Sequence, residues 1–211
     1  KGINKRKIEF FPQWAESVYK PINLKGKTVF PFLKMDSFKI VFAGNIGESQ
    51  DFRSILKTAI ILKNKNIDWI IIGDGRKKSW LKERIIENRL EHCFHLLGRF
   101  PIEKMPMYFA ASDCLLFSLK KKEIFSLTIP GKVQAYLACS KPILAMIDGE
   151  ANEIIKDAKA GLVCSSESPE LLAKNIDNLL AMDRHSLKVM GENGLKCSLK
   201  MCDRNILISK L

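Results

Sequence analysis

The sequence predicts an α/β domain of the Rossmann-like type, with a parallel sheet of about six strands and helices on both faces of the sheet. From Phe38 onward, short apolar segments alternate with longer segments in which apolar residues recur at helical spacing. Several apolar segments end in glycine, as at Gly44 and Gly73. This alternation is typical of β-α-β crossovers, which set parallel strands side by side and cover the sheet with helices.

The apolar segments are continuous rather than alternating, as expected for parallel strands that are buried on both faces. The predicted strands cover residues 38–44, 67–75, 93–98, 114–119, 142–148 and 162–166. The predicted helices cover residues 51–66, 79–90, 103–112, 130–140, 150–160, 168–182 and 183–201. Ligands of such sheets bind at the carboxyl ends of the strands, where the glycine-bearing turns lie. Tight strand–helix turns also need glycine, so each turn alone is a weak indication of a ligand.

Residues 1–37 do not fit the alternation. They carry eight Lys or Arg against three acidic residues, and residues 7–14 are compatible with one strand that stops at a proline. No core can be built from this stretch alone. We therefore predict that residues 1–37 are an interdomain connection or a remnant of a preceding domain, and that residues 38–211 form the Rossmann-like domain.

The net charge of +12 results from 35 Lys and Arg against 23 Asp and Glu. A positive field of this size favours anionic partners and anionic membrane surfaces, although a lysine-rich proteome produces the same excess. The densest cluster, Lys5-Arg6-Lys7, is shorter than a typical nucleic-acid-binding arm. No nucleic-acid partner is therefore predicted.

The six cysteines form no C-x-x-C pair, and no histidine lies at zinc-ligand spacing from them, so no metal site is predicted. Several lie in apolar runs, where a thiol behaves as a small hydrophobic group. We expect structural cysteines and a reducing, cytoplasmic compartment. No apolar run approaches about 18 residues, so no transmembrane helix is predicted. No signal peptide is recognised at the start of the chain.

The stretch "IPGKVQAYLACSKPILA", residues 129–145, places a helix start directly before an apolar strand. Pro130 suits the first turn of a helix, where its missing N–H costs nothing. Gly131 leaves the backbone open, and the first amides point out of the positive end of the helix dipole. Lys132 adds a full charge. These features together suit a diphosphate, whereas an ordinary helix cap explains them equally well.

Four segments, "FAGNIGESQD", "IIIGDGRKK", "LLGRFPIEKMPMYFAASDCLLFSL" and "IPGKVQAYLACSKPILA", follow one another in a characteristic order and spacing. They resemble the C-terminal, donor-binding domain of GT-B glycosyltransferases, specifically the retaining family 4. The opening "KIEFFPQWAES" is similar to that family's interdomain connection. The resemblance implies a nucleoside-diphosphate sugar donor, with UDP as the expected nucleotide and no cofactor or metal. It also implies that an acceptor-binding N-terminal domain precedes Lys1.

The resemblance assigns a role to several positions. The turn at Arg99 and Phe100 is expected to hold the base, and Lys132 and Glu123 are the expected catalytic residues. The remaining expected donor-binding residues are Gly44, Asn45, Gly47, Gln50 and Gly73 near the diphosphate, Gly131 and Val133 at the helix start, Ser126, Leu127 and Thr128 at the sugar, and Gln134. Stabilising the charge on a departing diphosphate is the task that such a site performs.

The sequence departs from the family pattern at several of these positions. Asn45 and Gln50 stand where many members carry an Arg and a Lys, and Lys132 is expected to compensate. Ala135 stands where the family usually has the Glu that holds the ribose hydroxyls, so Gln134 or Tyr136 is a possible substitute. The preceding Glu of the pattern falls at Leu127 without a gap, or at Glu123 with a longer loop. The alternative interpretation of Glu123, a solvated charge beside Lys120, Lys121 and Lys122, is slightly favoured.

The resemblance implies retaining transfer to a cell-surface polysaccharide or to a lipid-linked acceptor. In the latter case, peripheral contact with anionic lipid at the inner membrane face is compatible with the charge. The isolated domain is expected to bind nucleotide and to transfer little.

The sequence leaves two alternative functions open. A UDP-sugar 2-epimerase of the same fold requires additional acidic and His groups near the sugar, which are not found. A non-enzymatic basic module requires basic residues with interleaved aromatics on one face.

Overall fold

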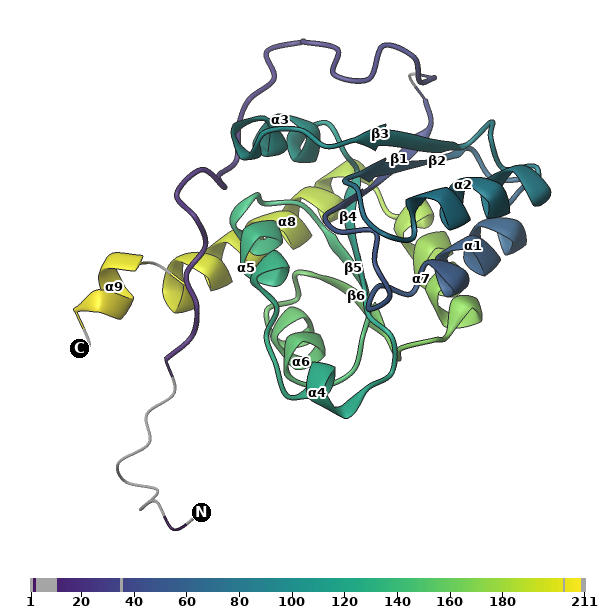
Figure 1. Cartoon of the computed structure of the whole chain (residues 1–211). Coiled ribbons are helices and arrows are strands. Elements are labelled where there is room, and N and C mark those ends of the chain that lie inside the picture. Colours follow the sequence, from purple (N-terminus) through teal and green to yellow (C-terminus); the bar gives the residue numbers. More distant parts are fainter. Residues whose placement is uncertain (1, 3–10, 35, 203, 210–211) are drawn as a thin grey trace.

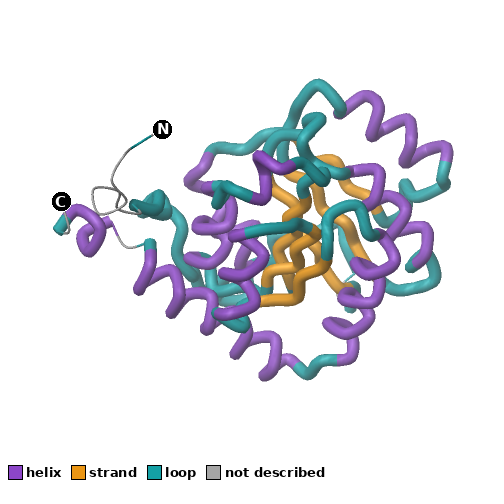
Figure 2. The backbone as a smooth tube through the Cα atoms, turned by 90° about the horizontal axis from the view of Figure 1, so that it is seen from below, coloured by secondary structure: helices purple, strands orange, loops and turns teal. Residues whose placement is uncertain are grey.

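A computed structural model describes residues 2, 11–34, 36–202 and 204–209. A six-stranded sheet with the strand order β3-β2-β1-β4-β5-β6 forms its centre, and every pair of neighbouring strands is parallel. Figure 2 shows the strands side by side in the middle, with helices around them. The strands are β1 (Phe38–Ala43), β2 (Ile67–Ile72), β3 (Phe94–Gly98), β4 (Cys114–Ser118), β5 (Ile143–Met146) and β6 (Gly161–Cys164). The predicted Rossmann-like fold class is confirmed.

The helices occupy most of the predicted segments, but they are shorter at their ends. They are α1 (Phe52–Ile61), α2 (Lys78–Glu87), α3 (Met105–Ala110), α4 (Glu123–Ser126), α5 (Gly131–Ala138), α6 (Glu150–Asp157), α7 (Pro169–Ala181), α8 (Arg184–Met201) and α9 (Arg204–Ile208), with a 3-10 turn at Ile102–Lys104. The short helices α4 and α9 were not predicted as separate elements. Four or five residues are too few to display helical periodicity in a sequence.

The two faces of the sheet bury two separate cores. Along β1, Ile40 and Phe42 point into one core, whereas Val41 and Ala43 point into the other, because successive side chains of a strand face opposite sides. The first core lies under α1, α2 and α7, and the second lies under α3, α5 and α6. A sheet covered on both faces explains why the predicted strands are continuously apolar.

The chain order of the strands reverses between β1 and β4. From β1 the chain proceeds outward to β2 and β3, and it then returns to add β4, β5 and β6 on the other side (Figure 1). The crossovers diverge at this point, which leaves a crevice beyond the carboxyl ends of β1 and β4. The turn after β1 and the start of α5 both lie here, so the fold brings the two parts of the expected phosphate site together.

Part of the connection belongs to the folded domain. Figure 1 shows it crossing α8 and then looping above α3 and β3. Phe30 is buried in the second core, with Val29 and Leu33 packed against it. The strand predicted over residues 7–14 falls partly outside the described residues, and residues 11–14 form no strand. None of the described helices is long and apolar enough to pass through a lipid bilayer.

The approach of β2 to β1 at their carboxyl ends yields a stability prediction. Gly73 has a φ of 146°, and an added Cβ would collide with the carbonyl oxygen of Gly44. We expect Gly73→Ala to lower the free energy of unfolding by roughly 2 to 4 kcal/mol, because it combines backbone strain with overpacking. Urea denaturation measures this change.

Gly98→Ala is the matched control. Its φ of 79° is also unfavourable for alanine, but no atom lies within 4 Å of the added Cβ. It is therefore expected to cost only the backbone strain, about 1 kcal/mol. Equal losses in the two variants would contradict the steric explanation.

Candidate functional site

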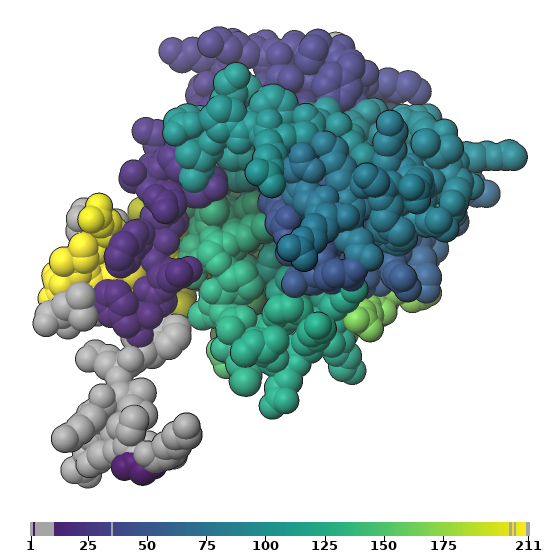
Figure 3. Space-filling view, in the orientation of Figure 1, coloured from purple at the N-terminus to yellow at the C-terminus, as the bar shows by residue number. Residues whose placement is uncertain are grey.

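A cavity of about 810 Å³ opens beyond the carboxyl ends of β1, β2 and β3. Its other walls are α3, the first turns of α5 and residues of the connection, and Figure 3 shows this face hollowed between the connection and the β1–α1 region. Its size falls within the range of small-molecule sites. The residues expected to bind the donor that line this cavity are Gly44, Asn45, Gly73, Arg99, Phe100, Gly131 and Lys132.

Lys132 places a buried ammonium group in this cavity. Its Nζ lies 4.0 Å from the centre of the Phe42 ring and 5.7 Å from that of Phe117, and it has no hydrogen-bond acceptor among the described residues. Gly44 allows this approach, because a Cβ at that position would lie 2.5 Å from Nζ. Burial lowers the pKa of Lys132 to about 7. A buried charge without a partner is costly, so the position suits an anionic ligand.

The start of α5 adds backbone donors next to this ammonium group. Pro130 is extended, with φ −66° and ψ 139°, and the helix begins at Gly131. Val133 donates its N–H to the carbonyl of Pro130 at 2.9 Å, whereas the N–H groups of Gly131 and Lys132 make no hydrogen bond among the described residues. Two open amides and a cation at the positive end of a helix form an anion-binding arrangement. The amide of Val133 is committed to its turn.

Tyr136 fastens α5 to the end of β1. Its hydroxyl accepts a hydrogen bond from the N–H of Ala43 at 3.0 Å and donates one to the carbonyl of Ala43 at 3.3 Å. Burial is the main reason that its pKa lies well above the usual range. Because both hydrogen bonds are made inside the protein, Tyr136 is a positioning residue and not a free ligand for ribose.

The other candidate for a ribose ligand lies elsewhere. Gln134 is buried on a different side of α5, where it lines a narrow crevice with Leu137 and Cys197. Ala135, in contrast, faces the large cavity and brings no polar group to it. Successive residues of a helix point about 100° apart, so the side chain of Gln134 cannot share the direction of Ala135.

Gln50 and Gly47 lie beside the cavity and not in its wall. The side-chain oxygen of Gln50 accepts a hydrogen bond from the N–H of Gly47 at 3.2 Å, which holds the turn after β1. Both residues line a small neighbouring depression together with Trp80. Asn45 is therefore the only one of the two uncharged replacements that faces the cavity.

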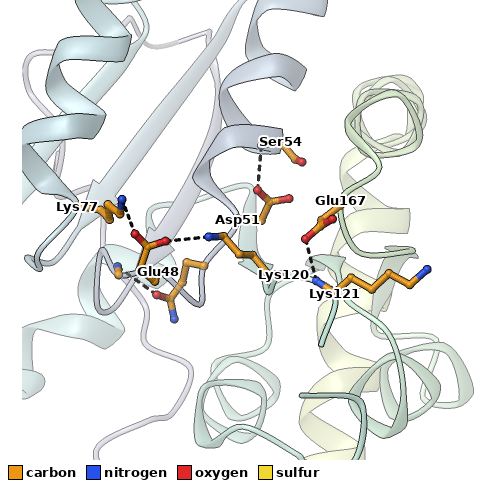
Figure 4. Close-up of polar contacts among 9 residues, drawn as sticks. Glu48, Asp51, Ser54, Lys77, Lys120, Lys121 and Glu167 are labelled. Atoms are coloured by element: carbon orange, nitrogen blue, oxygen red, sulfur yellow. Dashed lines mark hydrogen bonds and ion pairs between the residues drawn. The ribbon is translucent and has the colours of Figure 1, made fainter. Parts of the chain in front are cut away.

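A carboxylate that the sequence did not single out joins three loops at the rim. Glu48, in the turn after β1, pairs with Lys77 and with Lys120, the latter at 2.8 Å (Figure 4). The N–H of Lys120 also donates to the carbonyl of Ser49 at 2.9 Å. The hydrogen bond from Lys120, followed by that from Lys77, lowers the pKa of Glu48 to about 2. Lys77 is thus engaged at the rim, away from the phosphate position at α5.

Of the residues expected at the sugar and Glu123, only some line a second, smaller cavity. This space of about 350 Å³ lies between the end of β4 and the start of α6, and Glu123 and Ser126 line it. Leu127 is 69% exposed, and the hydroxyl of Thr128 donates to the carbonyl of Ile124 at 3.2 Å. Leu127 and Thr128 line neither cavity. The short helix α4 directs them outward.

The connection forms a wall of the large cavity that sequence reasoning missed. Gln13, Trp14, Glu16 and Tyr19 all line it. In the sequence, this wall corresponds to the Gln-Trp-Ala-Glu stretch at residues 13–16, which by itself indicates only a link between domains. Within the described ranges, no group of three His, Cys, Asp or Glu side chains gathers as metal ligands would.

Comparison with known proteins identifies the family. Residues 28–196 match the family described as glycosyl transferases group 1. The chain belongs to this family. It is 29% identical over 189 residues to "Probable glycosyltransferase WbjE" of Pseudomonas aeruginosa, covering 86% of this chain and 46% of that protein. It is 24% identical over 200 residues to "Putative colanic acid biosynthesis glycosyl transferase WcaI" of Escherichia coli, covering 88% of this chain and 47% of that protein.

The fold also agrees with solved structures of such enzymes. The crystal structure of Anabaena Alr3699/HepE in complex with UDP-glucose superposes with a TM-score of 0.70 at 17% identity, covering 83% of this chain and 47% of that one. The predicted resemblance to GT-B glycosyltransferases is confirmed. This chain spans less than half the length of each of the curated relatives it matches.

The buried ammonium group yields a prediction about stability and pH. Lys132→Met keeps the apolar contacts with Phe42 and Phe117 but removes the charge, so we expect it to raise the free energy of unfolding near pH 6 by roughly 3 kcal/mol. Burial lowers the pKa of Lys132 in the folded protein to about 7. Between that pH and about 10, the unfolded chain therefore binds more protons than the folded protein. The wild type therefore gains stability over this range, and the difference between the two proteins shrinks.

Urea denaturation at a series of pH values from 6 to 10 measures this difference. Lys141→Met is a suitable control, because burial also lowers the pKa of Lys141 but its Nζ donates to the carbonyl of Ser112 at 2.6 Å. Its loss leaves an acceptor without its donor, so this variant is expected to be less stable than the wild type. A Lys132→Met variant that is destabilised at every pH would contradict the unpaired charge.

Proposed function

We propose that this chain binds a nucleoside-diphosphate sugar, linked to UDP, in the large cavity and presents the sugar for transfer. The observation that carries the proposal is the unpartnered ammonium group of Lys132 beside two open amides at the start of α5. Family membership and the UDP-glucose complex of Alr3699/HepE support the choice of ligand class. A diphosphate is the part of such a donor that needs this arrangement.

In this proposal, the diphosphate lies between the turn after β1 and the start of α5. The amides of Gly131 and Lys132 and the ammonium group of Lys132 hold the charge that develops as the sugar departs. Asn45 donates a hydrogen bond from the facing wall, in place of a charged side chain. The base lies toward Arg99 and Phe100, where β3 ends and the Phe100 ring packs 4.8 Å from that of Tyr108.

The acceptor is proposed to be a cell-surface polysaccharide or a lipid-linked precursor, and the transfer to retain the anomeric configuration. The name of WcaI, which refers to colanic acid biosynthesis, supports the first part. The acceptor is expected to bind to a domain preceding residue 1, so the 211-residue chain alone should bind nucleotide and transfer little. Peripheral contact with anionic lipid at the cytoplasmic face of the membrane is compatible with the net charge of +12.

Nucleotide titration tests the proposal directly. We expect UDP to bind the 211-residue chain with a dissociation constant between about 1 μM and 1 mM, more tightly than GDP or ADP, as measured by isothermal titration calorimetry. Lys132→Ala and Lys132→Met are expected to weaken UDP binding by about 10- to 150-fold, which is the range for a hydrogen bond with a charged group. Folded protein that binds none of the three nucleotides would contradict the proposal.

The pH dependence of binding follows from the depressed pKa of Lys132. Below about pH 7 the Lys132 side chain is already protonated. Above that pH its neutral amine must take up a proton when the phosphate binds. We expect UDP affinity to fall by up to about tenfold per pH unit above 7, with net proton uptake seen as a dependence of the binding enthalpy on buffer. In Lys132→Met, the pH dependence of UDP affinity should reflect only the titration of the nucleotide itself. A wild type with the same pH dependence as this variant would contradict the role of Lys132.

A further inference from the structure

The connection runs alongside α5 for the whole length of that helix. At one end, the side-chain oxygen of Gln13 lies 3.4 Å from the position of a Cβ on Gly131. At the other end, the backbone N–H of Lys20 lies against the Cys139 thiol. Tyr19 secures this course, because its ring stacks on Phe109 at 6.1 Å with an interplanar angle of 13°.

This course brings Glu16 to the same cavity as Ala135. Glu16 lies about midway along the connection between the residues that meet the two ends of α5, and Ala135 lies midway along α5 itself. Both residues line the large cavity. Glu16 is also close enough to Tyr19 for its charge to raise the pKa of that hydroxyl, after burial and the Cys139 thiol. Glu16 therefore lies near Tyr19, whose ring packs on Phe109.

Glu16 has an unengaged carboxylate in the cavity wall. Of the described residues that line the cavity, two carry a carboxylate, Glu16 and Asp74. Asp74 accepts a hydrogen bond from the N–H of Gly75 at 2.8 Å and pairs with Lys78 at 3.4 Å. The carboxylate of Glu16 has no hydrogen-bond or ion-pair partner in the described part of the chain. Of the two carboxylates, that of Glu16 is therefore the one that no described residue engages.

The distance from the phosphate position suits a ribose. Ala135 follows Lys132 by three residues, which is about 4.5 Å along the helix axis. A nucleotide whose α-phosphate lies at Lys132 and whose base lies toward Arg99 has its ribose between these points. The surrounding wall offers Met105, Phe109 and Ala135, and the Tyr136 hydroxyl is already committed. The connection is the neighbouring part of the wall that carries an unengaged carboxylate.

We propose that Glu16 binds the ribose of the nucleotide, with its carboxylate accepting hydrogen bonds from the 2′- and 3′-hydroxyl groups across from Ala135. The inference rests on the proposed function, since it requires that the cavity holds a nucleoside diphosphate. It makes the connection part of the nucleotide site. Trp14, two residues away in the same wall, then reports on ligand binding through its fluorescence.

Paired titrations with UDP and 2′-deoxy-UDP test this role. The wild type is expected to bind UDP at least tenfold more tightly than 2′-deoxy-UDP, because a hydrogen bond to a charged group is lost. Glu16→Ala is expected to weaken UDP binding by a similar factor and to bring the ratio of the two affinities close to one. Binding of inorganic pyrophosphate, which has no ribose, should be unchanged or slightly tighter in this variant.

A gain-of-function variant guards against a merely structural effect. Ala135→Glu, made in the Glu16→Ala background, places a carboxylate on the facing wall and is expected to restore the preference for UDP. Glu103→Ala, at an exposed carboxylate of the turn before α3, is the matched control and should leave the ratio unchanged. Urea denaturation confirms that each variant is folded.

The possible results distinguish a failure of the Glu16 role from a failure of the proposed function. A Glu16→Ala variant that keeps the wild-type ratio would overturn the role of Glu16, and so would an equal loss of UDP and pyrophosphate binding. In either case, UDP binding that depends on Lys132 would leave the proposed function standing. A folded wild type that binds neither UDP nor pyrophosphate would remove the proposed function and this inference together.

Discussion

The site is organised around one unpaired positive charge, the ammonium group of Lys132, buried where the strand order of the sheet reverses. The folded protein holds this charge against the rings of Phe42 and Phe117 without an acceptor among the described residues. Such an arrangement costs stability in the free protein, since water has been removed and no counter-charge replaces it. In the proposed function an anionic ligand supplies the missing partner, so the burial that destabilises the free chain would strengthen the interaction of Lys132 with phosphate.

Several contacts around this charge keep its surroundings in place. Tyr136 joins the middle of α5 to the end of β1 through two hydrogen bonds with Ala43. Glu48 joins the turns after β1, β2 and β4 by pairing with Lys77 and Lys120 (Figure 4). Because these contacts are made within the protein itself, they preorganise the amides and the ammonium group at α5. Preorganised donors are effective in stabilising charge that develops during a reaction.

The fold was largely predictable, whereas the composition of the site was predictable only in part. Helical and strand periodicity arise from local geometry, and burial on both faces makes the strands continuously apolar, so all six strands and most helices could be recognised. The phosphate site proposed at Gly131 and Lys132 could be predicted because a helix start, a glycine and a lysine adjoin in the sequence. Gln134 and Tyr136 were considered as ribose ligands because sequence alone does not show that one faces away and that the other is already hydrogen-bonded.

The sequence by itself therefore determined the alternating α/β architecture, the family and the helix start that carries Lys132. Only the tertiary structure decided that the Lys132 ammonium group has no acceptor among the described residues, that Glu48 spans three loops, and that Glu16 and Ala135 line one cavity. The physical reason is the separation along the chain. Residues 16 and 135 line the same cavity only because the connection packs against α5, and no local pattern encodes a contact between segments so far apart.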